Sequence, residues 1–163
     1  MEYPNDVRED PRTQWEASMD AKYAVAAHGL AEHYFSSINR WLVFLQIIFT
    51  SGAIAAIAKQ STEWSIVVGV LLALVSAYQQ AAKPLAEAAK HGAVKEKFSL
   101  LVAEISGMTV EAIDKKLATV GAKAPKIPRA IQFAAYNDNL RTNGRPDGVV
   151  KESIPVQFIR LLA

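Results

Sequence analysis

The sequence contains no cysteine. This absence excludes disulfide bonds, thiolate zinc sites and cysteine nucleophiles, and it is compatible with a cytoplasmic or inner-membrane protein. A strong excess of charge is also missing, because the net charge is only +2 and does not by itself indicate nucleic-acid binding. The chain has 163 residues, of which 51% are hydrophobic and 21% are charged, so it is able to bury the core of one domain.

The sequence also lacks the common catalytic motifs. It has no HExxH, no Walker loop, no GxSxG and no pair of carboxylates on a shared face. We therefore expect no enzyme, no cofactor and no metal site. Residues 1–20 are acidic and polar and lack the apolar core of a signal peptide. We expect residues 1–14 to be a flexible N-terminus, and we expect the first apolar run, which begins at Trp41, to remain as an anchor.

Charge is absent from two long apolar runs, residues 41–58 and 64–82. As helices they would each be about 27–28 Å long, close to the roughly 30 Å core of a bilayer. Trp41 and Trp64 begin the runs, and such amphipathic rings are common at headgroup depth. The pattern predicts a two-transmembrane helical hairpin with residues 59–63 as its turn. The alternative is a buried hairpin in a soluble bundle, which would need a large surrounding core.

Cations flank the two runs on their outer sides. Lys22 and Arg40 precede the first run, four lysines lie within residues 83–102, and Lys59 is the only cation in the turn. The positive-inside rule then places both termini in the cytoplasm and the turn outside. We expect a multi-pass protein of the bacterial inner membrane.

Polar and small residues interrupt the apolar runs at helical spacing. Five polar residues are candidates for lining a pore or for bonding between helices: Asn39, Gln46, Thr50, Ser65 and Ser76. Small residues recur at four-residue steps, which lets membrane helices approach closely. The candidate helix-packing residues are Gly52, Ala56, Gly69, Ala73 and Ala77. One hairpin cannot enclose a pore, so a pore requires a homo-oligomer.

Hydrophobic periodicity predicts further helices outside the two runs. They cover residues 12–40, 85–106, 109–119 and 128–144, with a linker at 124–128. The predicted apolar stripe of the first helix consists of Trp15, Met19, Tyr23, Ala26, Leu30, Tyr34, Ile38 and Trp41, and that of the second consists of Val94, Phe98, Leu101, Val102 and Ile105.

The histidines receive a structural interpretation. His28 and Glu32, four residues apart, are expected to form a solvated pair on the face opposite the first stripe. His91 lies on the second stripe and is expected to be a packed side chain. A metal-binding role for His91 is the alternative, but no second ligand follows it at helical spacing.

The order of these parts resembles that of the SLATT family, the two-transmembrane effector domains associated with bacterial nucleotide-signalling and other conflict systems. The resemblance covers residues 15–144 and leaves residues 145–163 as a C-terminal tail. It depends on the succession of a long helix, the hairpin, the segment AEAAKHGAVKEKFSLLVAEI and the segment PKIPRAIQFAAYND. The matched positions are Tyr23, His33, His91, Phe98, Leu101 and Asn137.

The resemblance implies an effector that forms a pore or perturbs the inner membrane, and so causes growth arrest or cell death in antiphage defence. It also implies activation by a nucleotide second messenger or a sensor protein, and it supplies no catalytic residue. Two other functions stay open at this point. The chain could be a non-conducting membrane anchor or scaffold for a cytoplasmic partner, or a soluble helical-bundle interaction protein.

Overall fold

The computed structural model describes residues 11–162, and over these residues the protein is all α-helical, as predicted. The α-helices are α1 (Gln14–Ala58), α2 (Thr62–Ala82), α3 (Pro84–Glu104), α4 (Val110–Gly121), α5 (Arg129–Thr142) and α6 (Ile154–Leu162). The short 3-10 helices η1 (Ile105–Gly107) and η2 (Pro146–Gly148) lie in the connections. Of the segment predicted to be flexible, residues 1–14, the first ten lie outside the described residues.

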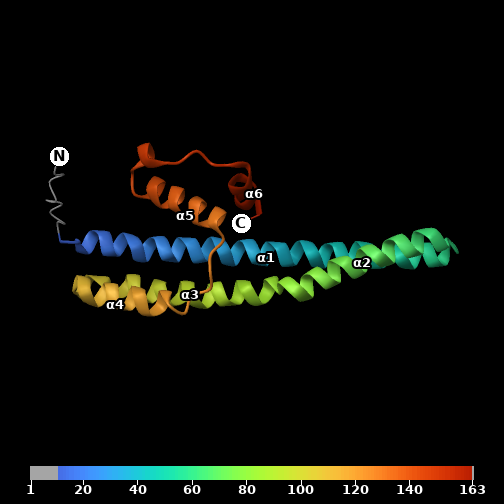
Figure 1. Ribbon diagram of the computed structural model, residues 1–163, viewed down its shortest axis with the longest axis horizontal. Helices are drawn as coiled ribbons and strands as arrows, with labels where there is room; N and C mark the ends of the chain where they lie inside the picture. The colour runs from blue at the N-terminus through green and yellow to red at the C-terminus, as the bar shows by residue number, and fades with distance from the viewer. Residues whose placement is uncertain (1–10, 163) are drawn as a thin grey trace, which may run out of the picture.

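Helix α1 forms the long axis of the molecule (Figure 1). It begins with a capping box, in which the Thr13 hydroxyl accepts a hydrogen bond from the Glu16 amide and the Glu16 carboxylate accepts one from the Thr13 amide. The sequence has no proline between residues 12 and 83, so nothing forces a break. The predicted helix over residues 12–40 therefore continues without interruption through the first apolar run, over about 68 Å.

The hairpin turn is shorter than predicted. Helix α1 ends at Ala58 and α2 begins at Thr62, so the connection consists of residues 59–61 rather than 59–63. Gln60 takes the left-handed conformation, with φ of 56°, which reverses the chain. Helix α2 then runs antiparallel to α1 and returns to the level of residue 39.

The second helical arm is broken where Pro84 predicted a kink. Lys83 ends α2 with a left-handed backbone, φ 44° and ψ 51°, and Pro84 occupies the first turn of α3. Proline disfavours the right-handed helical conformation in the residue before it, which explains why the irregular residue is Lys83. Helix α3 then continues along the first half of α1, and α4 folds back beside it.

The apolar stripe predicted for the first helix is confirmed only in part, by Leu30 and Tyr34, which are half-buried against a small core. The face of α1 buried against the other helices consists mainly of small residues, including Ala17, Ala21 and Ala31, whereas Trp15 and Trp41 are exposed. Small side chains let α1 and α3 approach closely, and the large side chains of α3 fill the space between them. Phe98, Leu101 and Ile105 of the second predicted stripe are buried in this core, together with Ile113 of α4.

The helix predicted over residues 128–144 is confirmed as α5, but it is not the last helix of the chain. Helix α6 follows it, and Ile159 of α6 packs with Ile131 of α5 and Ala31 of α1 in a second, smaller core. The connection is held by the buried Asn137, whose side-chain amide donates to the Val150 carbonyl at 2.8 Å and whose oxygen accepts from the Val150 amide at 3.0 Å. The tail beyond residue 144 is therefore folded onto α1 and α5.

Candidate functional site

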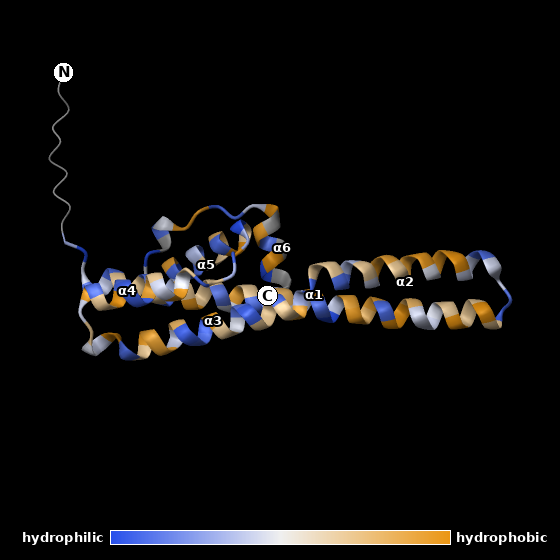
Figure 2. Ribbon diagram, turned by 60° about the horizontal axis from the view of Figure 1, so that its bottom comes forward, coloured by the Kyte–Doolittle hydropathy of each residue, from blue (hydrophilic) through white to orange (hydrophobic). Residues whose placement is uncertain are grey.

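The hairpin leaves its apolar side chains uncovered. Helix α1 and the α2–α3 arm are each long and apolar enough to cross a membrane. No residue of α2 is buried, and Ile54, Trp64 and Leu74 each expose more than 60% of their surface. Figure 2 shows this mostly hydrophobic hairpin standing apart from the other helices at one end of the molecule. Soluble monomers rarely expose apolar surface of this extent.

A chain of polar side chains joins the two helices at the base of the hairpin. The Gln46 amide donates to the Gln79 side-chain oxygen at 2.7 Å and to the Ser76 hydroxyl at 3.3 Å. The Gln79 amide in turn donates to the Asn39 side-chain oxygen at 3.1 Å. Three of the five polar candidates therefore meet between α1 and α2. Gln79, at the end of the second run, belongs to this network but was not among the candidates. A polar side chain inside an uncharged run could have identified it.

The other two polar candidates lie elsewhere. Thr50 is exposed on α1, one turn beyond Gln46. The Ser65 hydroxyl donates to the Ser61 carbonyl at 2.9 Å, so it satisfies itself on its own helix. The structure thus does not bring Thr50 and Ser65 into the network.

The small-residue candidates divide between the inside and the outside of the hairpin. A Cβ at Gly52 would touch Val68 of the opposite helix at 3.6 Å, and Ala56 is buried. A Cβ at Gly69 would meet nothing within 4 Å, and Ala73 and Ala77 are exposed. The α2 set therefore makes no close helix contact within one chain and faces outward.

A buried histidine pair joins α1 to α3 below the hairpin. The Nδ1 atoms of His28 and His91 are 2.9 Å apart, so one ring donates the proton and the other accepts it. The rings also stack on aromatic neighbours, His28 on Phe98 and His91 on Phe35. His91 Nε2 is buried without a hydrogen-bond partner. This arrangement suits two neutral rings.

Burial lowers the pKa of both histidines. Desolvation, followed by the neighbouring His91, lowers the pKa of His28 from 6.5 to about 4. Desolvation is also the main reason why the pKa of His91 is lowered. The packed interpretation of His91 fits this geometry, and the second histidine close to it comes from α1, 63 residues earlier. A distant contact of this kind has no periodic signal in the sequence.

The predicted solvated pair of His28 with Glu32 is wrong. His28 is only 4% exposed, and Glu32 instead accepts a hydrogen bond from Lys95 of α3 at 3.1 Å. Gly92 leaves room for this carboxylate, because a Cβ there would lie 3.0 Å from Glu32 Oε1. The reason for the error is that α3 covers the face of α1 that was expected to meet water.

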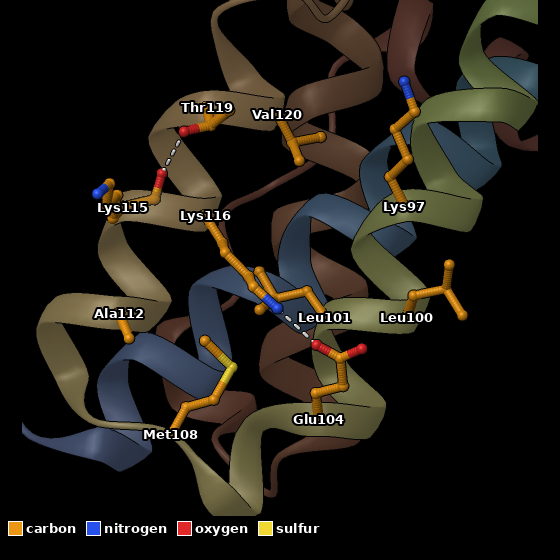
Figure 3. Close-up of a pocket in the computed structure, with 10 residues that line it drawn as sticks. All are labelled: Lys97, Leu100, Leu101, Glu104, Met108, Ala112, Lys115, Lys116, Thr119 and Val120. Carbon is orange, nitrogen blue, oxygen red and sulfur yellow. Dashed lines mark hydrogen bonds and ion pairs between the residues drawn. The ribbon is translucent and has the colours of Figure 1, made fainter.

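A groove of about 450 Å³ lies between α3 and α4, away from the hairpin (Figure 3). Its lining includes the apolar side chains of Leu100, Leu101, Met108 and Val120. Lysines from both helices stand around it, and Lys116 pairs with Glu104 across the two helices at 2.5 Å. The groove offers apolar contact together with the positive charge of Lys97, Lys115 and Lys116.

Within residues 11–162, no group of three or more histidine, aspartate or glutamate side chains is arranged so that it could hold a metal ion. Comparison with known proteins found no matching family model, no similar curated protein and no similar solved structure. The resemblance to the SLATT family therefore stays a prediction from the sequence.

Proposed function

We propose that this protein is a membrane effector that inserts its hairpin into the bacterial inner membrane and oligomerises to form a pore or to perturb the bilayer. Its helical bundle and both termini would then lie in the cytoplasm. Opening would cause growth arrest or cell death during antiphage defence, in response to a nucleotide second messenger or a sensor protein. The effector chemistry is ion or solute leakage, and no enzymatic step is proposed.

The observation that carries this proposal is the uncovered hairpin. The α2 helix and the second half of α1 contact each other and leave their aliphatic and aromatic side chains exposed on the outside. Lipid is the partner that accepts such a surface without further protein. The same observation argues against a soluble bundle. Helices α3 to α6 lie beside the N-terminal part of α1, and no residue of α2 is buried.

The outward face of α2 supports assembly. Gly69 has open space in front of its backbone, and Ala73 lies one turn away on the same exposed face. Small residues in that arrangement allow a second hairpin to approach closely in a membrane. Thr50 also faces outward, from α1, and would supply a polar wall once several hairpins surround a common axis.

A specific observation favours the anchor as a second candidate function. The Gln46 amide is bonded to Gln79 and Ser76 inside the hairpin, so this polar residue is accounted for without a pore. A non-conducting scaffold would use the same hairpin and present the α3–α4 groove to a cytoplasmic partner.

Carbonate extraction of membranes tests insertion first, because only an integral protein remains in the pellet. Dye or ion release from vesicles containing the purified protein then separates pore from anchor. For a pore, Thr50→Leu should reduce release, because it makes the wall apolar and favours dewetting. Ser51→Leu is the matched control, since Ser51 is also exposed but points about 100° away around α1. Extraction into the supernatant would reject both membrane functions, and retention without any release, also after addition of nucleotide second messengers, would reject the pore.

A further inference from the structure

A hollow of about 370 Å³ opens on α1 where the apolar run begins. It is lined by Arg40, Trp41 and Phe44. The two rings stand edge to face, with centroids 5.7 Å apart and an angle of 80° between their planes. Both rings are more than half exposed, at 56% for Trp41 and 51% for Phe44. The site therefore combines one cation with two open aromatic walls.

The guanidinium of Arg40 is held in one orientation by a hydrogen bond. Arg40 Nη2 donates to the hydroxyl of the buried Ser37 at 2.7 Å. A guanidinium has five N–H donors, so this bond orients the group and leaves donors for an anion. The Arg40 side chain meets no acidic partner among residues 11–162.

The charge around the hollow is of one sign. The sequence has no acidic residue between Glu32 and Glu63 on α1, and none between Glu63 and Glu87 on the other arm. Glu32 and Glu87 are themselves paired with lysines of α3. The hydrogen bond between Gln79 and Asn39 puts Lys83 near the level of Phe35, more than one helical turn farther from the hairpin tip than Arg40.

We propose that Arg40, Trp41 and Phe44 bind one anionic phospholipid at the cytoplasmic surface of the membrane. This inference rests on the proposed insertion of the hairpin. The phosphate contacts the Arg40 guanidinium, and the glycerol and upper acyl carbons lie against the two rings. Trp41 and Phe44 are the first aromatic residues of the uncharged run, so they lie where headgroup gives way to hydrocarbon. Lipid of this charge would fix the depth of the hairpin and couple the bundle to membrane composition.

The test uses Trp41 as the probe. Trp15→Phe and Trp64→Phe leave Trp41 as the single tryptophan, since the chain has three. The purified protein is placed in phosphatidylcholine vesicles in which either a brominated phosphatidylcholine or a brominated phosphatidylglycerol supplies the quencher. We expect the anionic lipid to quench Trp41 more strongly at equal content. Arg40→Gln should lower the relative affinity for it about fivefold, the effect of one cation near a membrane surface.

Matched variants separate this site from general attraction. Lys59→Gln removes a cation at the opposite end of the hairpin and should leave the preference unchanged. Arg40→Lys keeps the charge but loses the oriented fork, and should keep part of the preference. Ser37→Ala should also weaken it, because the guanidinium is then unheld.

The outcomes are distinct. Equal quenching by the two lipids, or a preference unaffected by Arg40→Gln, would overturn the lipid site while leaving membrane insertion standing. Relief of quenching by inorganic phosphate at constant ionic strength would show a general anion site instead of a lipid site. The absence of quenching by either lipid would mean that Trp41 is not in the membrane, and the proposed function would fail with it.

Discussion

His28 and His91 illustrate at the residue scale how burial sets the charge of a side chain. Each ring has lost water, and only one proton can occupy the 2.9 Å line between the two Nδ1 atoms. A second proton on that line would place two N–H groups against each other. The pair therefore packs between α1 and α3 as two neutral rings. Their burial lowers the stability of the fold only at acidic pH, where a ring would have to take up a second proton.

Acid should weaken the packing of α1 on α3. His28 has a folded pKa of about 4 against 6.5 in the unfolded chain, so between these values the unfolded chain binds the extra proton. The stability contributed by the neutral ring is thus complete above pH 6.5 and is lost as the pH falls towards 4. The loss should be on the order of 3 kcal/mol. Chemical denaturation in detergent, followed by circular dichroism at a series of pH values, measures it.

Two glutamine variants isolate this contribution. His28→Gln removes the titrating group and should flatten the slope of stability between pH 6.5 and 4. His33→Gln removes an exposed histidine of the same helix and is the matched control. Parallel slopes for the wild-type protein and His28→Gln would show that other groups cause the acid sensitivity.

Asn137 is a second residue whose role is decided by the fold. Its side chain makes a two-way hydrogen-bonded contact with the backbone of Val150, and Glu152 beside it pairs with Arg160 of α6 at 2.9 Å. Asn137→Ala should release the segment that carries α6, because the backbone N–H and C=O of Val150 lose their hydrogen bonds to Asn137, at a cost of about 1–3 kcal/mol. Hydrogen exchange should then become faster in residues 149–160 and stay unchanged in α2. Asn139→Ala, which removes only a contact with Asn143 in the same helix, is the control.

At the scale of helices, the break at Lys83 separates the part of the arm beside the hairpin from the part in the bundle. A lysine in the left-handed region costs free energy that glycine or asparagine would largely avoid. Helix α1 has no such break opposite it, so one arm is continuous and the other is jointed. Tilting of the hairpin relative to the bundle would concentrate its backbone change at Lys83.

Two substitutions at Lys83 should differ although both remove the charge. Lys83→Asn should be nearly neutral, because asparagine tolerates positive φ. Lys83→Val should destabilise the fold by about 1–2 kcal/mol relative to Lys83→Asn, because a β-branched side chain clashes in that conformation. The same pair at Lys90, in the regular part of α3, should differ by only a few tenths of a kcal/mol. Denaturation of the four variants measures both differences, and equal stability of the two Lys83 variants would mean that the joint carries no strain.

The helices were more predictable from the sequence than the faces they bury. The two uncharged runs, the absence of proline before Pro84 and the break at that proline give α1, α2 and α3 almost to the residue. The buried face of α1 was not predictable, because alanines such as Ala17 and Ala21 bear no strong hydrophobic signal and are selected by the nearness of α3. Helix α6 was not predicted, because the contacts that stabilise it come from distant parts of the chain. Ile159 packs on Ala31 of α1, and Asn137 of α5 holds the segment that precedes α6.

The candidate site was predictable to a similar degree. Gln46 and Ser76 stood out because polar side chains are rare in uncharged runs, and they do meet in the structure. That they meet through Gln79 depends on the register of α2 against α1, which the short turn at residues 59–61 determines. The outward direction of Gly69 and Thr50 depends on the same register, and no local pattern reveals it.

At the scale of the whole molecule, the shape separates a hairpin end from a bundle end. Because α1 crosses both parts and the chain returns along α2, residues at the tip and in the bundle must lie on opposite sides if the hairpin spans a membrane. The distribution of lysine and arginine predicts that the bundle lies on the cytoplasmic side. The chain has no cysteine, so a single introduced cysteine reports its own side without interference.

Thr62→Cys at the tip should react with an impermeant thiol reagent in intact spheroplasts, whereas Ser106→Cys at the far end of the bundle should not. Both positions are exposed, so differences in reactivity reflect the membrane and not burial in the protein. After permeabilisation both should react, which verifies that each thiol is accessible. Labelling of Ser106→Cys but not Thr62→Cys in intact cells would reverse the orientation and place the cationic ends outside. Equal labelling of both after cell lysis without detergent, with the protein in the soluble fraction, would mean that the hairpin is covered by protein instead of lipid.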